Sequence, residues 1–278
     1  MQKYAQIPEQ LRHRGLVTAA NFFEPTPIAE EVALLTHTKA YWDHLIQGTL
    51  HPKIIRRIGF PLSPQLVLRE RIIAQGTVDA ALYALQHGVA FNVAGGTHHA
   101  FADSGDAYCL LNDCAIAANY LLHKGLAKNM LIIDLDVHQG QGTAHIFENN
   151  TAVYTFSMHS QGSYPLKKER SNLDVPLPPQ CSGTQYLELL SEALSTLATN
   201  SFDFVFYVAG VDVLATDKLG QLQLSMAHCG QRDRLVFDFC TQQGLPIAVT
   251  MGGGYSPEIS DIVTAHCNTY EVALGVMK

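Results

Sequence analysis

The chain has 278 residues, of which 47% are hydrophobic and 15% are charged, a balance typical of a globular protein and not of a disordered one. Its formal net charge is −7 and it contains no long basic run, which argues against direct nucleic-acid binding, because Lys and Arg contacts to phosphates dominate that affinity. Residues 1–15 lack the apolar core of a signal peptide and no apolar stretch approaches ~18 residues, so we expect a cytoplasmic protein without a membrane segment.

Short apolar runs predict buried parallel strands, and the helical patterns between them predict an alternating α/β chain. The expected elements are a helix over 64–87, a strand over 89–94, a helix over 110–124, strands over 130–135 and 152–158, a helix over 184–199, a strand over 204–209, a helix over 228–243 and a strand over 246–251. The proline-rich patch 175–179 is expected to be a loop. This order predicts one doubly wound, mostly parallel sheet flanked by helices, in a single domain spanning 1–278.

Chemically reactive side chains follow four of the predicted strands. They are His98 and His99 after the strand over 89–94, Asp136 and His138 after 130–135, Asp212 after 204–209, and Tyr255 after 246–251. Because ligands bind at the carboxyl ends of parallel strands, we expect these side chains to converge on one pocket.

Asp136, His138 and Asp212 form a candidate metal site. Residues i and i+2 of a strand point to the same face, so Asp136 and His138 can reach one ion. Two carboxylates and one imidazole suit a catalytic Zn²⁺ that keeps a position open for water. An isolated Asp-x-His is commonplace and a lone strand-end Asp is more often a cap or turn residue, but their combination favours a metal. Gly140 and Leu214 stand where a two-metal hydrolase needs further Asp ligands, so we expect one catalytic metal.

A histidine pair and a tyrosine complete the candidate site. His98 and His99 follow a double glycine, and imidazoles that titrate near neutral pH serve as general acids and bases, although a single such His is more often structural. Tyr255 follows the glycines 252–254, whose backbone freedom lets a phenol approach a metal and stabilise an oxyanion. A phosphate-binding loop is the weaker interpretation of these glycines, because no Lys-Ser/Thr follows them.

Five motifs resemble those of the zinc-dependent histone deacetylase superfamily, which has the arginase/deacetylase fold. They are GGTHHA at 95–100, CLLND at 109–113, DLDVHQGQG at 134–142, AGVD at 209–212 and GGGY at 252–255. The resemblance is collinear from about residue 60 to near the C-terminus. Within the superfamily, HQGQG and VDVLATDKLGQLQLS are most similar to the class IV branch and its bacterial relatives.

The resemblance implies a role for each matching position. The implied zinc ligands are Asp136, His138 and Asp212, the implied catalytic residues are His98, His99 and Tyr255, and the residues that support the histidines are Asp134 and Gln141. A structural K⁺ is implied at Asp134, Asp136, His138, Ser157 and Met158, and a substrate tunnel is implied at Tyr108, Tyr164, Gly253 and Gly254. Fe²⁺ is the alternative to Zn²⁺ in the cell.

The sequence departs from the family in two places. Gln141 stands where class I enzymes carry an Asp that supports the second histidine, and Gln does not stabilise an imidazolium as a carboxylate does. We therefore expect His99 to remain neutral more readily. The family also has an extra strand before the segment that matches residues 1–11, so we expect either a sheet edge that lacks this first strand or a reorganised N-terminus.

Together these features predict a metal-dependent amide hydrolase that removes acetyl or longer acyl groups from the N-acyl-lysine of proteins. One alternative is a deacetylase of acetylpolyamines or another small acyl-amine, which would need an acidic residue at the pocket mouth to hold the distal cation. Another is a catalytically inactive zinc-binding scaffold, which would have no reason to keep Tyr255 beside intact ligands. The sequence leaves the oligomeric state open.

Overall fold

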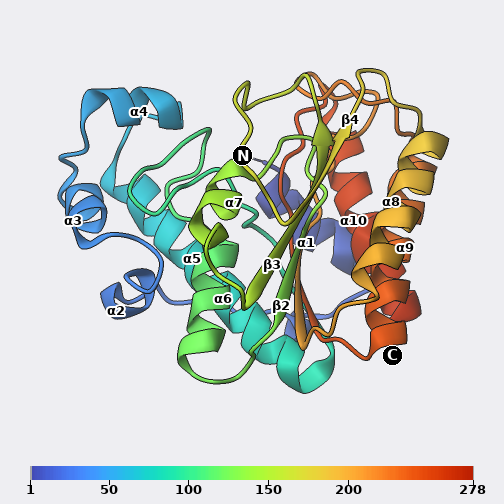
Figure 1. The fold of residues 1–278 in the computed structure, drawn as a ribbon, viewed down its shortest axis with the longest axis horizontal. Coiled ribbons are helices and arrows are strands. Elements are labelled where there is room, and N and C mark those ends of the chain that lie inside the picture. The colour runs from blue at the N-terminus through green and yellow to red at the C-terminus, as the bar shows by residue number, and fades with distance from the viewer. Residues whose placement is uncertain (1, 278) are drawn as a thin grey trace.

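Within residues 2–277, which the computed structural model describes, six strands form one sheet in the order β1-β6-β5-β2-β3-β4. The strands are β1 (Val89–Asn92), β2 (Met130–Asp134), β3 (Val153–Ser160), β4 (Leu173–Leu177), β5 (Phe204–Val208) and β6 (Ile247–Thr250) (Figure 1). Every neighbouring pair is parallel, as βαβ crossovers require. The predicted α/β fold with a parallel sheet is therefore confirmed.

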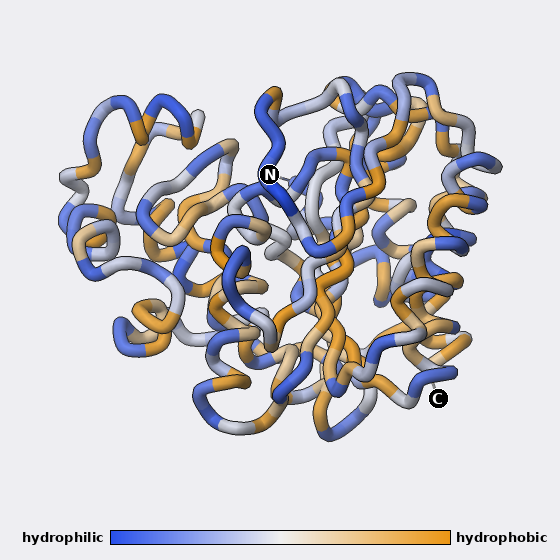
Figure 2. The backbone as a smooth tube through the Cα atoms, viewed as in Figure 1, coloured by the Kyte–Doolittle hydropathy of each residue, from blue (hydrophilic) through white to orange (hydrophobic). Residues whose placement is uncertain are grey.

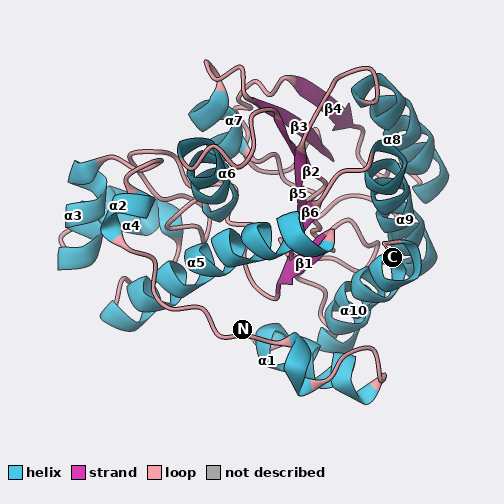
Figure 3. Ribbon diagram, turned by 90° about the horizontal axis from the view of Figure 1, so that it is seen from below, coloured by secondary structure: helices cyan, strands magenta, loops and turns pink. Residues whose placement is uncertain are grey.

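Helices cover both faces of this sheet (Figure 3). One face carries α1 (Lys3–His13), α8 (Gly183–Leu197), α9 (Met226–Gln243) and α10 (Ile259–Val276). The other carries α5 (Pro64–His87), α6 (Asp113–His123) and α7 (Gln141–Phe147), with the short helices α2 (Glu30–Ala33), α3 (Lys39–Gln47) and α4 (Pro52–Ile58) packed outside them and a 3₁₀ turn at Ala19–Asn21 before them. None of the helices formed by residues 2–277 has the length and apolar character needed to cross a bilayer.

The central strands are apolar because both of their faces are covered. Along β2, Leu131 and Ile133 pack into the core beneath α8, α9 and α10, whereas Met130 and Ile132 pack into the core beneath α5 and α6. Alternate side chains of a strand point to opposite faces, so two cores require an uninterrupted apolar run. Figure 2 shows the result as hydrophobic colouring along the middle of the sheet.

Local capping fixes where the helices begin. The Ser63 hydroxyl accepts a hydrogen bond from the Leu66 backbone N–H, Pro64 occupies the first turn, and α5 covers the predicted residues. Helix α6 starts at Asp113, later than predicted, because the Asn112 side chain accepts a hydrogen bond from the Ala115 N–H and caps the helix. The cap of α6 matters for the site, since the Asn112 side chain also donates to the Ala100 carbonyl, next to the histidine pair.

The expectation of a loop over 175–179 is wrong for its first residues. Leu173–Leu177 is β4, paired with β3 at the edge of the sheet, and Pro176 faces His159 in the register. Proline lacks a donor for the ladder and is tolerated in a strand only at such an edge, which is where the chain places it. Strand β3 also continues to Ser160, beyond the predicted end.

The sheet order brings the reactive loops together. Strands β1, β6, β5 and β2 are consecutive neighbours, so the segments that leave their carboxyl ends lie side by side at one edge of the sheet. These are the four segments that carry the histidine pair, the glycine turn and the three candidate ligands. The predicted convergence is a direct consequence of this strand order.

Candidate active site

Asp136, His138 and Asp212 lie together and are buried at the ends of β2 and β5, each offering one ligand atom within 4.8 Å of the others. His138 Nδ1 lies 3.1 Å from Asp136 Oδ1 and 3.3 Å from Asp212 Oδ2. The remaining oxygens are oriented by the backbone: Asp212 Oδ1 accepts from the Val137 N–H, and Asp136 Oδ2 accepts from the Gly253 N–H. The chain thus holds two carboxylates and an imidazole in fixed positions around one point.

The surroundings of this triad fit a cation. Asp212 Oδ2 is buried without a hydrogen-bond partner among the described residues, although an uncompensated buried carboxylate oxygen is costly. A Cβ at Gly253 would lie only 1.9 Å from this oxygen and 2.8 Å from Asp136 Oδ2, so glycine is needed beside both carboxylates. An orphaned oxygen, two buried acids and a backbone that leaves room around them are the features that a divalent metal satisfies.

The charges of the triad perturb one another. Burial lowers the pKa of the His138 imidazole, but the adjacent Asp136 and Asp212 carboxylates favour the protonated ring, outweigh burial and raise that pKa to about 10. Burial, and then the neighbouring Asp136 carboxylate, raise the pKa of Asp212 to about 6. The two acids repel each other unless positive charge lies between them, which is the condition that a metal provides.

The histidine pair is held by two different side chains. His98 Nδ1 lies 2.6 Å from Asp134 Oδ2, and His99 Nδ1 lies 2.6 Å from Gln141 Oε1, while the two Nε2 atoms are 3.1 Å apart. Gly140 is needed here, because a Cβ at that position would lie 2.2 Å from Asp134 Oδ2. The second-metal Asp that the sequence lacks at position 140 would therefore have no room.

Different supports give the two histidines different proton affinities. Burial lowers the pKa of His98, but the Asp134 and Asp136 carboxylates more than compensate and raise it to about 9. Burial, and then the nearby His98 and His138, hold the pKa of His99 well below its ordinary value, and the neutral Gln141 offsets little of this. The pair therefore consists of a readily protonated His98 beside a neutral His99.

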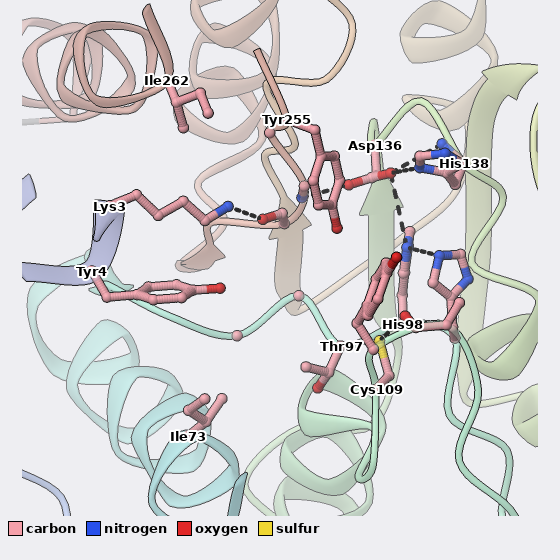
Figure 4. A pocket seen from close by; sticks show the side chains of 18 of the residues that line it. Lys3, Tyr4, Ile73, Thr97, His98, Cys109, Asp136, His138, Tyr255 and Ile262 are labelled. Carbon is pink, nitrogen blue, oxygen red and sulfur yellow. Dashed lines mark hydrogen bonds and ion pairs between the residues drawn. The ribbon is translucent and has the colours of Figure 1, made fainter. Parts of the chain in front are cut away.

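Tyr255 projects from the glycine turn toward the triad. Its backbone N–H donates to Asp217 Oδ2 at 2.6 Å, which anchors the turn, and its side chain is 36% exposed. In Figure 4, Tyr255 lies between Lys3 on one side and Asp136 and His138 on the other. The turn approaches the sheet closely, because a Cβ at Gly252 would lie 2.9 Å from the Gly210 backbone.

The candidate tunnel residues lie next to the histidines. Tyr108 and Tyr164 are 44% and 41% exposed, and the Tyr164 ring stands edge-on to His99 with the ring centroids 5.5 Å apart. Tyr108 has a left-handed φ of 67°, in a tight turn, and its ring is 6.3 Å from that of Tyr255. Both rings thus border the same opening above the histidine pair.

The K⁺ site stays a prediction. Asp134 and Ser157 are register partners on β2 and β3, and Met158 follows on β3. Asp134 is already engaged, since its Oδ2 lies beside His98 and its Oδ1 accepts from the Asp136 N–H. The Ser157 hydroxyl lies 3.0 Å from His159 Nδ1.

Two buried cations near the site were not anticipated from the sequence. Lys3 of α1 donates from Nζ to the Gly252 carbonyl at 2.9 Å, and burial lowers its pKa to about 8. Arg232 of α9 is fully buried and donates to the carbonyls of Leu135 and Gly210, which lead into the ligand-bearing turns, while pairing with Asp233. Breaking such a buried pair costs ~3–5 kcal/mol, so Arg232 fixes the backbone beneath the triad.

The chain is similar to a known protein family and to several of its members. A family model described as the histone deacetylase domain matches residues 1–270 of the chain. An uncharacterized protein of a Picosynechococcus species is 41% identical over 277 residues, which cover 99% of this chain and 92% of the relative. Histone deacetylase 2 of Arabidopsis thaliana is 26% identical over 271 residues, which cover 94% of this chain and 70% of the relative.

The solved structures agree with the fold. The crystal structure of an HDAC homolog from Aquifex aeolicus superposes with a TM-score of 0.83 at 23% identity, covering 96% of this chain and 76% of that one. At this identity the likeness concerns the fold alone. It supports the predicted arginase/deacetylase type of sheet.

Proposed function

The chain belongs to the histone deacetylase family, and we propose that it is a zinc-dependent amide hydrolase that removes the acyl group from N-acyl-lysine of proteins. Membership supports a deacetylase hydrolase, and the candidate metal site fits the metal dependence of the family. The observation that carries the proposal is the convergence of three candidate ligands, a histidine pair and Tyr255 at one edge of the sheet. We infer that residues 1–278 act as one catalytic domain, because both cores pack on one sheet.

Asp136, His138 and Asp212 would hold the metal, and Zn²⁺ or Fe²⁺ suits this mixed oxygen and nitrogen set. When bound, the metal supplies a Lewis acid for the acyl carbonyl and lowers the pKa of water toward ~7. Gly253 supports the site by donating its N–H to Asp136 Oδ2 while leaving the facing side of both carboxylates open.

The side chains around the metal site divide the proton transfers. Neutral His99 accepts the proton of the attacking water, since its low pKa keeps the ring unprotonated at neutral pH. Tyr255 donates a hydrogen bond from its hydroxyl to the carbonyl oxygen as negative charge develops there. His98, kept basic by Asp134, holds positive charge beside His99, and a proton from the pair passes to the leaving amine nitrogen.

Replacing Gln141 with Asp is expected to move the acid limb of the pH–kcat/KM profile to higher pH. A carboxylate beside Nδ1 stabilises the His99 imidazolium and raises its pKa, so the base is lost at a higher pH as the solution is acidified. Profiles of wild type, Gln141→Asp and Gln141→Asn between pH 5 and 9 provide the measurement. Gln141→Asn is the uncharged control, and identical acid limbs in the Asp and Asn variants would contradict the role of His99 as base.

A cavity of 430 Å³ beside the triad supports acyl groups longer than acetyl. It reaches from His99 and Tyr255 to α5 and α10, where Ile73 and Ile262 line it (Figure 4). An acetyl group fills only a small part of this volume, and each buried methylene contributes about 0.8 kcal/mol. Ile73 and Ile262 give the cavity an apolar part, while Lys3, Arg69 and Glu70 also line it.

The proposal is tested by hydrolysis of acetyl-, octanoyl- and myristoyl-lysine peptides and of acetylputrescine by the zinc-loaded protein. We expect turnover of peptides by wild type and its loss in Tyr255→Phe and His99→Ala. Turnover of acetylputrescine alone would assign the protein to small acyl-amines. Bound zinc without turnover of any of the four substrates would instead support an inactive scaffold.

The same panel run on Ile73→Phe tests the acyl cavity. The larger ring occupies the cavity, so octanoyl and myristoyl turnover should fall about tenfold or more relative to acetyl turnover. Ile72→Phe is the matched control, because the neighbouring Ile72 faces a different hollow beside β1. Equal losses for all chain lengths would place the acyl group elsewhere.

A further inference from the structure

A second cavity, of 600 Å³, meets the first at the reaction centre and opens to the surface between Tyr108 and Tyr164. Both cavities are lined by His99, His138 and Tyr255. A bound amide must have its carbonyl at this junction, so one cavity receives the acyl group and the other receives the amine. Because the first cavity is the acyl cavity proposed above, we assign the second cavity, which Tyr164 also borders, to the amine side.

Asp106 is the one carboxylate among the described residues that line the amine-side cavity. Its side chain is only 5% exposed, and both oxygens are engaged. Oδ1 accepts from the Tyr164 hydroxyl at 2.7 Å, and Oδ2 accepts from Arg57 Nη2 at 2.5 Å. The Arg57 side chain is 50% exposed, so the guanidinium covers the carboxylate from the solvent side.

Backbone hydrogen bonds hold the Arg57–Asp106 pair at the surface opening of the amine-side cavity, which we call its mouth. The Ala107 N–H donates to the Arg57 carbonyl at 3.0 Å, and the Tyr108 N–H donates to the Ile58 carbonyl at 2.7 Å. These bonds dock the end of α4 on the tight turn that carries Asp106, where Ala107 and Tyr108 both have positive φ. The Arg57–Asp106 pair therefore has a defined geometry and is not a chance contact of two flexible side chains.

Resting on the function proposed above, we propose that Arg57 occupies the place that a substrate ammonium would take on Asp106. A cationic acyl-amine would need this carboxylate to hold its distal nitrogen, but the carboxylate is already neutralised. Arg56 lines the same cavity and adds a second positive charge that repels such a substrate. The mouth thus selects acyl-amines whose far end is uncharged or acidic, such as N-acyl-lysine within a peptide chain, and rejects acetylpolyamines.

The test compares Arg57→Ala with Arg56→Ala, which removes the same charge from the same cavity without freeing Asp106. Calorimetry of spermidine binding to each zinc-loaded protein measures the affinity of the mouth for a polyamine cation and does not require turnover. We expect Arg57→Ala to bind spermidine at least about tenfold more tightly than wild type and Arg56→Ala, with the gain declining as salt is raised. Arg57→Lys should behave as wild type, and Asp106→Asn in the Arg57→Ala background should cancel the gain.

Turnover separates this inference from the proposed function. In Arg57→Ala we expect the ratio of kcat/KM for acetylputrescine to that for a capped acetyl-lysine peptide to rise about tenfold or more. A thermal melt establishes that each variant is folded, and Arg57→Gln repeats the test with a side chain of closer size. Unchanged spermidine binding in folded Arg57→Ala and Arg57→Gln would overturn the inference, whether or not the enzyme is active. Wild type that is inactive on every peptide would overturn the proposed function alone.

Discussion

Tyr255→Phe is expected to lower kcat for acyl-lysine hydrolysis by about 10²–10³, equivalent to ~2.7–4 kcal/mol, and to leave KM within a few-fold of wild type. The glycine turn brings the phenol hydroxyl, a neutral donor, beside the triad. Its hydrogen bond strengthens as the carbonyl oxygen gains charge. Loss of such a donor therefore affects the transition state more than the bound substrate.

The substitution isolates the hydroxyl because the ring is held by other contacts. The Tyr255 N–H remains bonded to Asp217, and the ring remains beside Tyr108. Burial, and then the charges of Asp136 and Asp212, raise the pKa of the Tyr255 hydroxyl above its ordinary value, so it is a protonated donor at neutral pH. Phenylalanine at position 255 should leave both the turn and the metal site in place.

Steady-state kinetics on an acetyl-lysine peptide provide the measurement, together with zinc content and melting temperature for each protein. Tyr108→Phe is the matched control, since Tyr108 borders the same two cavities from the opposite wall. Its kcat should remain within a few-fold of wild type. A Tyr255→Phe variant with bound zinc and wild-type kcat would remove Tyr255 from the mechanism.

The parts of the fold that could be predicted are those encoded by local pattern. The apolar runs that became β2 and β5 are uninterrupted because both strand faces are buried. Ser63, Pro64 and Gly88 mark the ends of α5 by capping chemistry. Parallel strands share one carboxyl edge, so the prediction of a parallel sheet was enough to expect the reactive residues to lie together.

Helices α1 and α10 were not predicted, for different physical reasons. Helix α1 carries Pro8 in its interior and is stabilised by tertiary contacts, with Ile7 and Leu11 buried in the core shared with α10. Helix α10 begins without a side-chain cap, and its β-branched residues favour strands over helices in isolation. In both segments, tertiary packing stabilises a helix that the local sequence alone does not predict.

The site residues that escaped prediction depend on contacts between distant parts of the chain. Arg57 and Asp106 are 49 positions apart, and no motif links an arginine at the end of α4 to a carboxylate in a tight turn. Lys3 and Gly252 are 249 positions apart. Charge alone predicts that such side chains are exposed, whereas the fold buries Lys3 and Asp106 and gives each a partner.

Asp212→Asn is expected to abolish the stabilisation of the protein by zinc while leaving the metal-free protein at least as stable as wild type at pH 7.5. Binding at ~100 times Kd stabilises a protein by ~2.7 kcal/mol, which corresponds to a rise in Tm of roughly 5 °C for a chain of this size. The variant lacks one of the two carboxylates that we propose as ligands of the ion, so its Tm should change little on adding zinc. Because the proposed reaction needs the metal, the variant should lose turnover together with zinc binding.

The stability of the metal-free variant follows from the sign of the Asp212 pKa shift. The folded-state pKa of about 6 lies above the unfolded value of 3.8, so the protonated acid stabilises the fold below about pH 4, and this contribution is lost as pH rises through 6. At pH 7.5 the ionised carboxylate is buried beside Asp136, and its Oδ2 lies 3.3 Å from His138 Nδ1 without making a hydrogen bond. Asparagine removes this buried charge at nearly constant size. Melting curves of wild type, Asp212→Asn and the charge-matched control Asp238→Asn on α9, each with and without zinc, provide the measurement. An equal zinc-induced rise in all three would show that Asp212 is no ligand, whereas a metal-free Asp212→Asn protein that melts well below wild type would show that this carboxylate stabilises the fold and does not strain it.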